Sequence, residues 1–259
     1  MAVCRQRSDL LDRKPVAYLT CNGTPPINNA PSLMTFVEVT TLFHEFGHGL
    51  QHMLTKMPYS RCAGIAGIEW DAVELPSQFM ENWCYHKPTV DSFAKHYQTG
   101  ETIDETLFQK VCDAKKHNAG SALLRQLYFG KMDMVLHSTF NPSLGIDGIL
   151  KLQHEIAKDY TVSPPLKTDR FLCSFSHIFA GGYSAGYYSY IWAEVLSADA
   201  FAAFEEVGLD NEKNIEVLGR KFADTVLGCG GGEHPADVYK SFRGRLATAD
   251  ALLRHRGVV

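Results

Sequence analysis

The chain has 259 residues, of which 45% are hydrophobic and 21% charged, with a formal net charge of -4. This composition is typical of a globular chain that can bury a hydrophobic core, and its acidic balance argues against a partner that is a nucleic acid. No apolar run approaches the ~20 residues that span a bilayer, and residues 1–7 lack the apolar segment of a signal peptide, so we expect a soluble, intracellular protein without a membrane partner.

The predicted secondary structure is mostly helical. In chain order, the pattern predicts a short strand over 15–21 and helices over 34–56, 69–86, 104–139 and 146–159. The stretch over 104–139 is either one long helix or a broken one. A proline-containing loop over 162–165 precedes a tyrosine-rich helix and two C-terminal helices. The expected fold class is therefore mainly α, with a strand element near the N-terminus.

The helix over 34–56 carries the string His-Glu-x-x-His at positions 44–48. Side chains at i and i+4 lie on the same helix face, so His44 and His48 can hold one zinc ion while Glu45 points at its open coordination position. Gly47 and Gly49 each cost about 1 kcal/mol relative to alanine inside a helix. Their presence predicts that another element packs close to the helix backbone here; the chemistry predicted is that of a peptidase.

A catalytic zinc takes three protein ligands and keeps one position for water, so the two histidines need a partner. His52 lies one turn beyond His48, but three successive i, i+4 side chains spread over more than about 10 Å of axis, too far for one tetrahedral ion. Glu74 lies in a segment that mixes apolar and acidic residues, unlike a fully solvated helix. Glu74 is therefore the stronger candidate.

Three motifs in order along the chain resemble the thimet oligopeptidase and oligopeptidase A family of zinc metallopeptidases. They are the His-Glu-x-x-His string, residues 73–83 and residues 181–190, and the likeness extends to the flanking residues 15–19 and 242–245. The bacterial and plant oligopeptidase A branch is the most similar. The resemblance implies a zincin-like helical catalytic domain that cleaves short peptides as a monomer.

The resemblance also implies roles for individual residues. His44, His48 and Glu74 match the ligands of one Zn²⁺ ion, and Glu45 matches the general base that takes a proton from the water on the zinc. Asp71 matches a carboxylate that orients a ligand histidine. From its spacing, three residues before Glu74, we expect Asp71 on the same helical face, where accepting the free imidazole N–H would fix the tautomer.

The tyrosine-rich segment supplies candidate donors for the oxyanion of the tetrahedral intermediate. Tyr183, Tyr187 and Tyr190 fall at i, i+4 and i+7 of a predicted helix that opens after residues 181–182. By resemblance, Tyr183 or Tyr187 holds the oxyanion, Tyr190 binds substrate, and His177 is a further catalytic group. From the residues alone, the alternative interpretation is a buried aromatic stripe.

Two weaker features complete the analysis. The glycine-rich stretch over 228–232 lacks the ending of a phosphate-binding loop, and we expect a mobile loop that borders the cleft. The seven cysteines are scattered and odd in number, which predicts free thiols and a reducing compartment. That compartment is the cytoplasm or, with a longer precursor, a mitochondrion or plastid.

Members of the family that the chain resembles are longer and carry a large helical region before the point where this sequence begins. Residues 1–259 are therefore expected to form the C-terminal part of a zinc peptidase catalytic domain. Two interpretations follow. The chain is either an active oligopeptidase or a catalytically impaired remnant that binds zinc but lacks half of the substrate channel.

Overall fold

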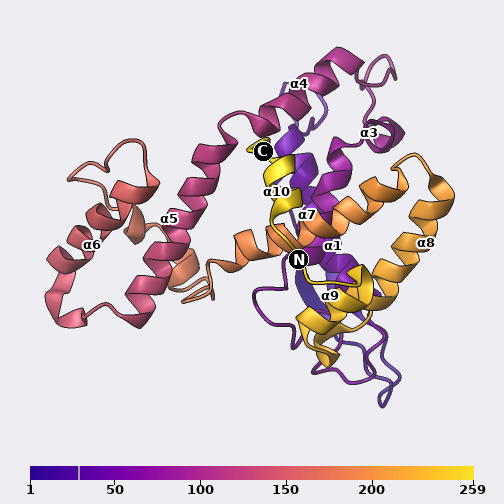
Figure 1. Cartoon of the computed structure of the whole chain (residues 1–259). Coiled ribbons are helices and arrows are strands. Elements are labelled where there is room, and N and C mark those ends of the chain that lie inside the picture. Colours follow the sequence, from indigo (N-terminus) through magenta and orange to yellow (C-terminus); the bar gives the residue numbers. More distant parts are fainter. Residues whose placement is uncertain (29) are drawn as a thin grey trace. The chain divides into compact units, whose positions relative to one another are not determined.

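Helices make up most of the computed structural model, which describes residues 1–28 and 30–259 (Figure 1). The prediction of a mainly α fold is confirmed. The chain forms two compact units: unit 1 comprises Met1–Ala114 and Ala193–Leu252, and unit 2 comprises Lys115–Trp192 and Leu253–Val259. Within the described part of the chain, no helix is both long and apolar enough to cross a bilayer.

Unit 1 begins with an antiparallel pair of strands, β1 (Ala2–Arg5) and β2 (Val16–Tyr18). Strand β2 lies within the strand predicted over 15–21, whereas the sequence analysis did not predict β1. The pair lies against the long helix that follows, because the Arg5 carbonyl oxygen is 2.9 Å from the Nε2 atom of His52. The N-terminal strands thereby support the helix that carries the metal-binding motif.

The predicted helix over 34–56 is confirmed as α1 (Phe36–Met53). Thr35 starts it with a capping box: its Oγ1 accepts from the Glu38 backbone N–H at 3.2 Å, and Glu38 Oε2 accepts from the Thr35 N–H at 2.6 Å. This backbone hydrogen bond from Thr35, with others from Thr35 and Thr24, lowers the pKa of Glu38 to about 2. The cap fixes where the helix that carries the two histidines begins.

The helix predicted over 69–86 is wrong in its first part. Helix α2 spans Leu75–Glu81 and continues as the 3₁₀-helix η1 (Asn82–Tyr85), while residues 70–74 form turns. Pro76 suits a helix start at this point, because proline lacks an N–H and fits the first turn of a helix, where that N–H would have no partner. Asp71 therefore does not share a helical face with Glu74.

Helices α1 and α2 pack at very close range. A Cβ atom added at Gly47 would lie 2.4 Å from the Pro76 carbonyl oxygen, so no larger residue fits there without a shift. On another side of α1, a Cβ atom at Gly49 would lie 3.2 Å from a methyl group of Leu19. The prediction that these glycines allow close packing against the helix backbone is confirmed at both positions.

Unit 1 also contains a further set of helices (Figure 1). They are α3 (Lys87–Phe93), α4 (Glu105–Lys116), α7 (Ser189–Val207), α8 (Glu212–Phe222), the π-helical turn η5 (Ala223–Leu227), the 3₁₀ turn η6 (Gly230–Gly232), α9 (Pro235–Arg243) and α10 (Asp250–His255). Helices α4, α7 and α10 each end or begin in unit 2. After α7, the structure adds the short α10 to the two predicted C-terminal helices.

The hydrophobic core of unit 1 is built on Phe79 of α2, whose ring stacks on Phe222 with centroids 4.3 Å apart and meets Phe204 at 5.2 Å. One buried charge, Asp199 on α7, is neutralised by two hydrogen bonds from Arg245 and one from the Tyr239 hydroxyl. The aromatic core packs α2 against α7 and α8, and the charge network connects α7 to α9 and to Arg245.

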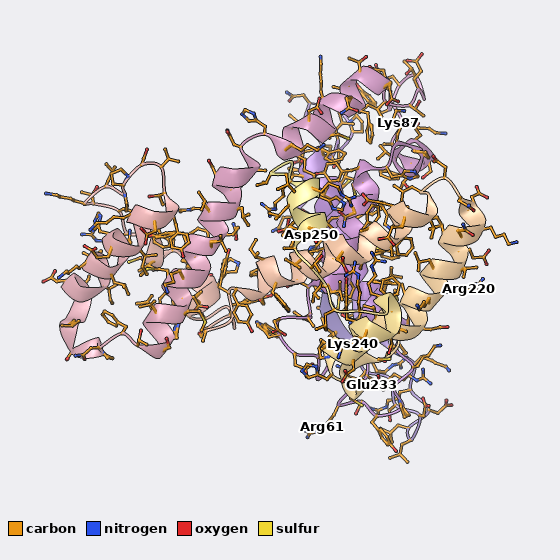
Figure 2. All side chains as sticks on the ribbon, viewed as in Figure 1. Arg61, Lys87, Arg220, Glu233, Lys240 and Asp250 are labelled. Atoms are coloured by element: carbon orange, nitrogen blue, oxygen red, sulfur yellow. The ribbon has the colours of Figure 1, made fainter. Side chains whose placement is uncertain are left out.

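The glycine-rich stretch over 228–232 packs against the segment after α1. The Gly231 N–H donates to the Cys62 carbonyl oxygen at 3.0 Å, and a Cβ atom at Gly230 would lie 2.4 Å from the same oxygen. Arg61 and Glu233, labelled in Figure 2, mark the two segments. The expected mobile loop is thus a packed one, and its glycines allow the two backbones to approach each other.

In unit 2, α5 (Ala119–Ser138) and α6 (Gly145–Tyr160) lie side by side (Figure 1). The stretch predicted over 104–139 is a broken helix, because Asn118 takes a left-handed conformation (φ 56°) between α4 and α5. The prediction over 146–159 corresponds to α6. The short 3₁₀ turns η2 (Pro142–Leu144), η3 (Phe171–Cys173) and η4 (Ser176–Ile178) complete the unit.

Candidate metal centre and tyrosine cluster

The structure brings the three predicted metal ligands together in unit 1. His44 and His48 lie one turn apart on α1, and Glu74 lies just before α2. Glu74 Oε2 is 3.3 Å from His44 Nε2 and 3.2 Å from His48 Nε2. One ligand atom from each residue lies within 4.8 Å of the others.

These separations fit a zinc ion. Ligand atoms about 2.0–2.2 Å from one tetrahedral ion lie roughly 3.3 Å apart, as the carboxylate and imidazole atoms do here. Two imidazole nitrogens and one carboxylate oxygen also form a donor set that is typical of catalytic zinc sites. The close contact at Gly47 brings α2, and with it Glu74, near enough to α1 to complete the set.

Glu45 follows the first ligand histidine, and its side chain is 21% exposed. Its Oε2 atom accepts a hydrogen bond from the amino group of Met1. The carboxylate also keeps some contact with solvent, as a group that exchanges protons with water requires.

A second carboxylate, missed by the sequence analysis, contacts His44. Glu81 Oε1 is 2.7 Å from His44 Nδ1, the ring nitrogen that does not face Glu74. This is the orienting contact that the sequence analysis expected from Asp71 for a ligand histidine. A signal existed, since Glu81 lies seven residues, or about two helical turns, after Glu74.

His48 and His52 differ in their surroundings. His48 Nδ1 is buried without a hydrogen-bond partner among the residues that the structure describes. His52 is fully buried, and its Nε2 atom faces the backbone of Arg5 rather than the ligand set. The structure therefore places Glu74, rather than His52, beside the imidazoles of His44 and His48.

The two carboxylates beside His44 raise the pKa of its imidazole, so metal binding at this residue is expected to depend on pH. Burial lowers the pKa of His44, but hydrogen bonds to Glu74 and Glu81 outweigh it and raise the pKa from 6.5 to about 9. In the metal-free protein, the charged imidazole therefore stabilises the fold fully below pH 6.5, and this stability is lost as the pH rises through about 9.

Since a protonated nitrogen cannot bind metal, we expect zinc binding at neutral pH to release a proton and to strengthen as the pH approaches 9. Titration calorimetry in two buffers of different ionisation enthalpy measures the proton count. Glu81→Gln is the matched control, because it removes one of the groups that raise the pKa of His44 and should reduce the proton release at pH 7. Equal proton counts for both proteins would contradict this explanation.

Unit 2 gathers the predicted tyrosines and His177 into an aromatic cluster. The rings of Tyr183 and Tyr190 stack with centroids 4.6 Å apart, and those of Tyr187 and Tyr190 are 5.1 Å apart. The His177 ring lies 6.0 to 6.3 Å from each of the three tyrosine rings. These four residues are referred to as the tyrosine cluster.

The helix predicted for these tyrosines is wrong at its start. Helix α7 begins at Ser189, so Tyr183 and Tyr187 lie in the preceding turns and only Tyr190 is helical. The reason is local, because Gly182 (φ 87°) and Ala185 (φ 53°) adopt left-handed conformations that a right-handed helix cannot contain. The turn, rather than a helical face, brings the rings together.

The members of the cluster differ in accessibility. Tyr187 is buried, its hydroxyl donates to Gln126 Oε1 at 3.0 Å, and burial raises its pKa to about 12. Tyr183 and Tyr190 are half-buried, and His177 is exposed. The Tyr187 hydroxyl is therefore already used inside unit 2, whereas Tyr183 and His177 have surface that a ligand can reach.

Comparison with known proteins gives consistent matches. Residues 1–258 match the model of peptidase family M3. The chain is 57% identical over 247 residues to probable cytosolic oligopeptidase A of Arabidopsis thaliana and equally similar over the same length to the organellar oligopeptidase A, chloroplastic/mitochondrial, of that plant. It is 51% identical over 246 residues to oligopeptidase A of Escherichia coli.

Each of these three matches covers 95% of this chain but only 31% to 35% of the relative. The chain thus spans about one third of the length of the curated relatives it matches. The matched region contains both the metal-ligand set and the tyrosine cluster.

Proposed function

Because the chain belongs to peptidase family M3, a family of zinc metallopeptidases, we propose that it is the catalytic portion of an oligopeptidase that hydrolyses short peptides. His44, His48 and Glu74 would hold one zinc ion. The observation that carries the proposal is the convergence of their ligand atoms in unit 1.

A zinc ion held there would supply positive charge to polarise the scissile carbonyl and to make water a stronger acid. The Glu45 carboxylate takes the proton from the attacking water and passes it to the nitrogen of the leaving amine. The Tyr183 hydroxyl donates to the substrate oxygen that becomes negative. Tyr183 is favoured over Tyr187 in this role because the Tyr187 hydroxyl donates to Gln126.

Three further roles belong to the same proposal. Tyr190 binds the peptide substrate, and His177 is a second donor toward it; the exposure of His177 supports such a contact. Asp71 would turn toward His48 and accept the hydrogen of its Nδ1 atom, which is buried without a partner in the described chain. Asp71→Ala should then weaken zinc binding about 10- to 100-fold. Unchanged zinc affinity would remove Asp71 from the site.

The test combines zinc content with cleavage of a quenched fluorescent peptide. We expect one zinc per chain, turnover that a chelator abolishes, and recovery of turnover when zinc is restored. The alternative function is the impaired remnant, which would bind zinc without cleaving peptides. Zinc bound at one per chain without turnover would support the remnant, and no tight zinc binding would contradict both.

The proposal also covers the cellular compartment and the oligomeric state of the protein. The names of the two plant relatives place one in the cytosol and one in chloroplasts and mitochondria. We therefore propose an intracellular protein, either cytosolic or organellar, that acts as a monomer on peptides. Imaging of the tagged gene product and sedimentation equilibrium test the two statements. Secretion or a stable dimer would contradict them.

A further inference from the structure

Asp133 lies on α5 in unit 2, and its side chain is completely buried. Its two carboxylate oxygens point at the turn that carries the tyrosines. Oδ1 accepts from the Ala185 N–H at 2.9 Å, and Oδ2 accepts from the Tyr187 N–H at 2.8 Å. One carboxylate thus accepts hydrogen bonds from two backbone N–H groups that are two residues apart, in a turn more than fifty residues away in the chain.

A third group completes the arrangement. His137, one turn after Asp133 on α5, places its Nδ1 atom 2.8 Å from Oδ1. The side chain of His137 is 26% exposed, whereas that of Asp133 is not exposed at all. A buried carboxylate is costly unless hydrogen bonds replace its water. Here three contacts do so, and the charged acceptor makes each of them stronger than a neutral bond.

The turn needs such an anchor. Ala185 has a φ of 53°, a left-handed conformation that is unfavourable for a residue with a Cβ atom. The Asp133 carboxylate accepts a hydrogen bond from the N–H of Ala185 itself, so the charged acceptor stabilises the residue that carries the strain. The hydrogen bonds from Asp133 offset the cost of this conformation. Without them, the segment before Ser189 would be less strongly held outside the helix that begins there.

Packing connects the anchor to the aromatic rings. Phe129, one turn before Asp133 on α5, meets the Tyr187 ring edge to face with centroids 5.6 Å apart. Gly130 of α5 faces the Tyr188 backbone, since a Cβ atom there would lie 3.7 Å from the Tyr188 Cα atom. Helix α5 therefore contacts the turn from Ala185 through Tyr188, and Asp133 supplies its polar attachment.

We propose that Asp133 is a positioning residue: it anchors the turn 183–187 to α5 and so sets the orientation of the Tyr183 hydroxyl toward the substrate. The proposal rests on the proposed function for the role of Tyr183. The anchoring itself concerns only unit 2. His137 holds the carboxylate in the orientation that both backbone N–H groups require.

Asp133→Asn tests the anchor with almost no change in shape. The amide keeps one acceptor but turns a donor toward a second backbone N–H, so one hydrogen bond becomes a repulsive contact. We expect kcat for the fluorescent peptide to fall about 10- to 100-fold, with KM changed less than threefold and zinc content unchanged. Asp169→Asn is the matched control, because Asp169 also accepts a backbone N–H in unit 2, from Phe171 at 3.0 Å. It should retain activity.

A double-mutant cycle separates positioning from general loss of stability. If Asp133 acts through Tyr183, then Asp133→Asn should lower kcat less than threefold in a Tyr183→Phe background, where the hydroxyl is already absent. Equal losses in both backgrounds would overturn the proposal. Should Asp133→Asn fail to fold, His137→Ala is the second variant: both backbone contacts remain, and kcat should fall by a smaller factor, about two- to fivefold, with the same dependence on Tyr183.

Hydrogen exchange of the segment 183–190 tests the anchor without any reaction. Asp133→Asn should make the amides of Ala185 and Tyr187 exchange at least tenfold faster than in the wild type and leave the Phe171 amide unchanged. Unchanged exchange would overturn the anchor. Faster exchange with full activity would overturn its role in catalysis and leave the proposed function intact. If the zinc-loaded wild type does not cleave the peptide, the proposed function fails, and exchange alone decides whether Asp133 anchors the turn.

Discussion

Glu45→Gln is expected to lower kcat for peptide cleavage by about 10²- to 10⁴-fold and to leave zinc bound. The glutamine side chain has nearly the same size but cannot accept a proton at neutral pH. The three ligand atoms belong to His44, His48 and Glu74, so the metal set stays complete. Loss of turnover without loss of zinc would assign Glu45 to proton transfer rather than to metal binding.

The measurement compares refolded, zinc-loaded wild type and Glu45→Gln with the fluorescent peptide, and zinc is quantified in both. Glu38→Gln is the matched control: it makes the same change on the same helix, at the capping box, where glutamine can replace glutamate. Turnover close to wild type in zinc-loaded Glu45→Gln would mean that the base is another group.

The metal helix could be predicted from sequence because its information is local. The apolar periodicity and the i, i+4 spacing of His44 and His48 determine a helix with both imidazoles on one face. The glycines at 47 and 49 indicated a close neighbour, and the structure identifies these neighbours as Pro76 and Leu19. The periodicity predicted α1 to within three residues at each end.

The third metal ligand, which comes from outside α1, was harder to predict from the sequence. Sequence reasoning alone left His52 and Glu74 as alternatives with unequal support, and distance along the helix axis decided between them. Glu81 was missed because its contact with His44 joins two separate helices. The resemblance implied this orienting role for Asp71, and its spacing from Glu74 predicted a shared helical face, but α2 begins only at Leu75.

The tyrosine turn and its anchor show a different limit. The i, i+4, i+7 spacing indicated a helical face, whereas the left-handed Ala185 interrupts the helix. Nothing in the sequence near Ala185 identifies the group that stabilises this conformation, because Asp133 lies more than fifty residues earlier. Long-range polar contacts of this kind carry no periodic signal, so they become visible only in the folded structure.

Gly47→Ala is expected to destabilise the metal-free protein by about 2 kcal/mol and to weaken zinc binding. Alanine improves helix propensity by about 1 kcal/mol. Against this gain, its Cβ atom would lie 2.4 Å from the Pro76 carbonyl oxygen and 2.5 Å from the Ser77 Cα atom. Both atoms are backbone and cannot rotate away, so overpacking should cost at the upper end of its usual range, about 3 kcal/mol. The clash therefore outweighs the propensity.

Gly49→Ala is the matched control on the same helix. Its Cβ atom would lie 3.2 Å from a Leu19 methyl group, the end of a side chain that can shift. The gain in propensity should then prevail, and this variant should be as stable as the wild type or slightly more stable. Urea unfolding of both variants measures the difference in their free energies of unfolding.

Glu74 directly precedes helix α2, which Gly47→Ala would displace. Gly47→Ala should therefore also bind zinc more weakly than the wild type, whereas Gly49→Ala should not. Equal zinc affinities in the two variants would mean that the spacing between α1 and α2 does not control the metal site.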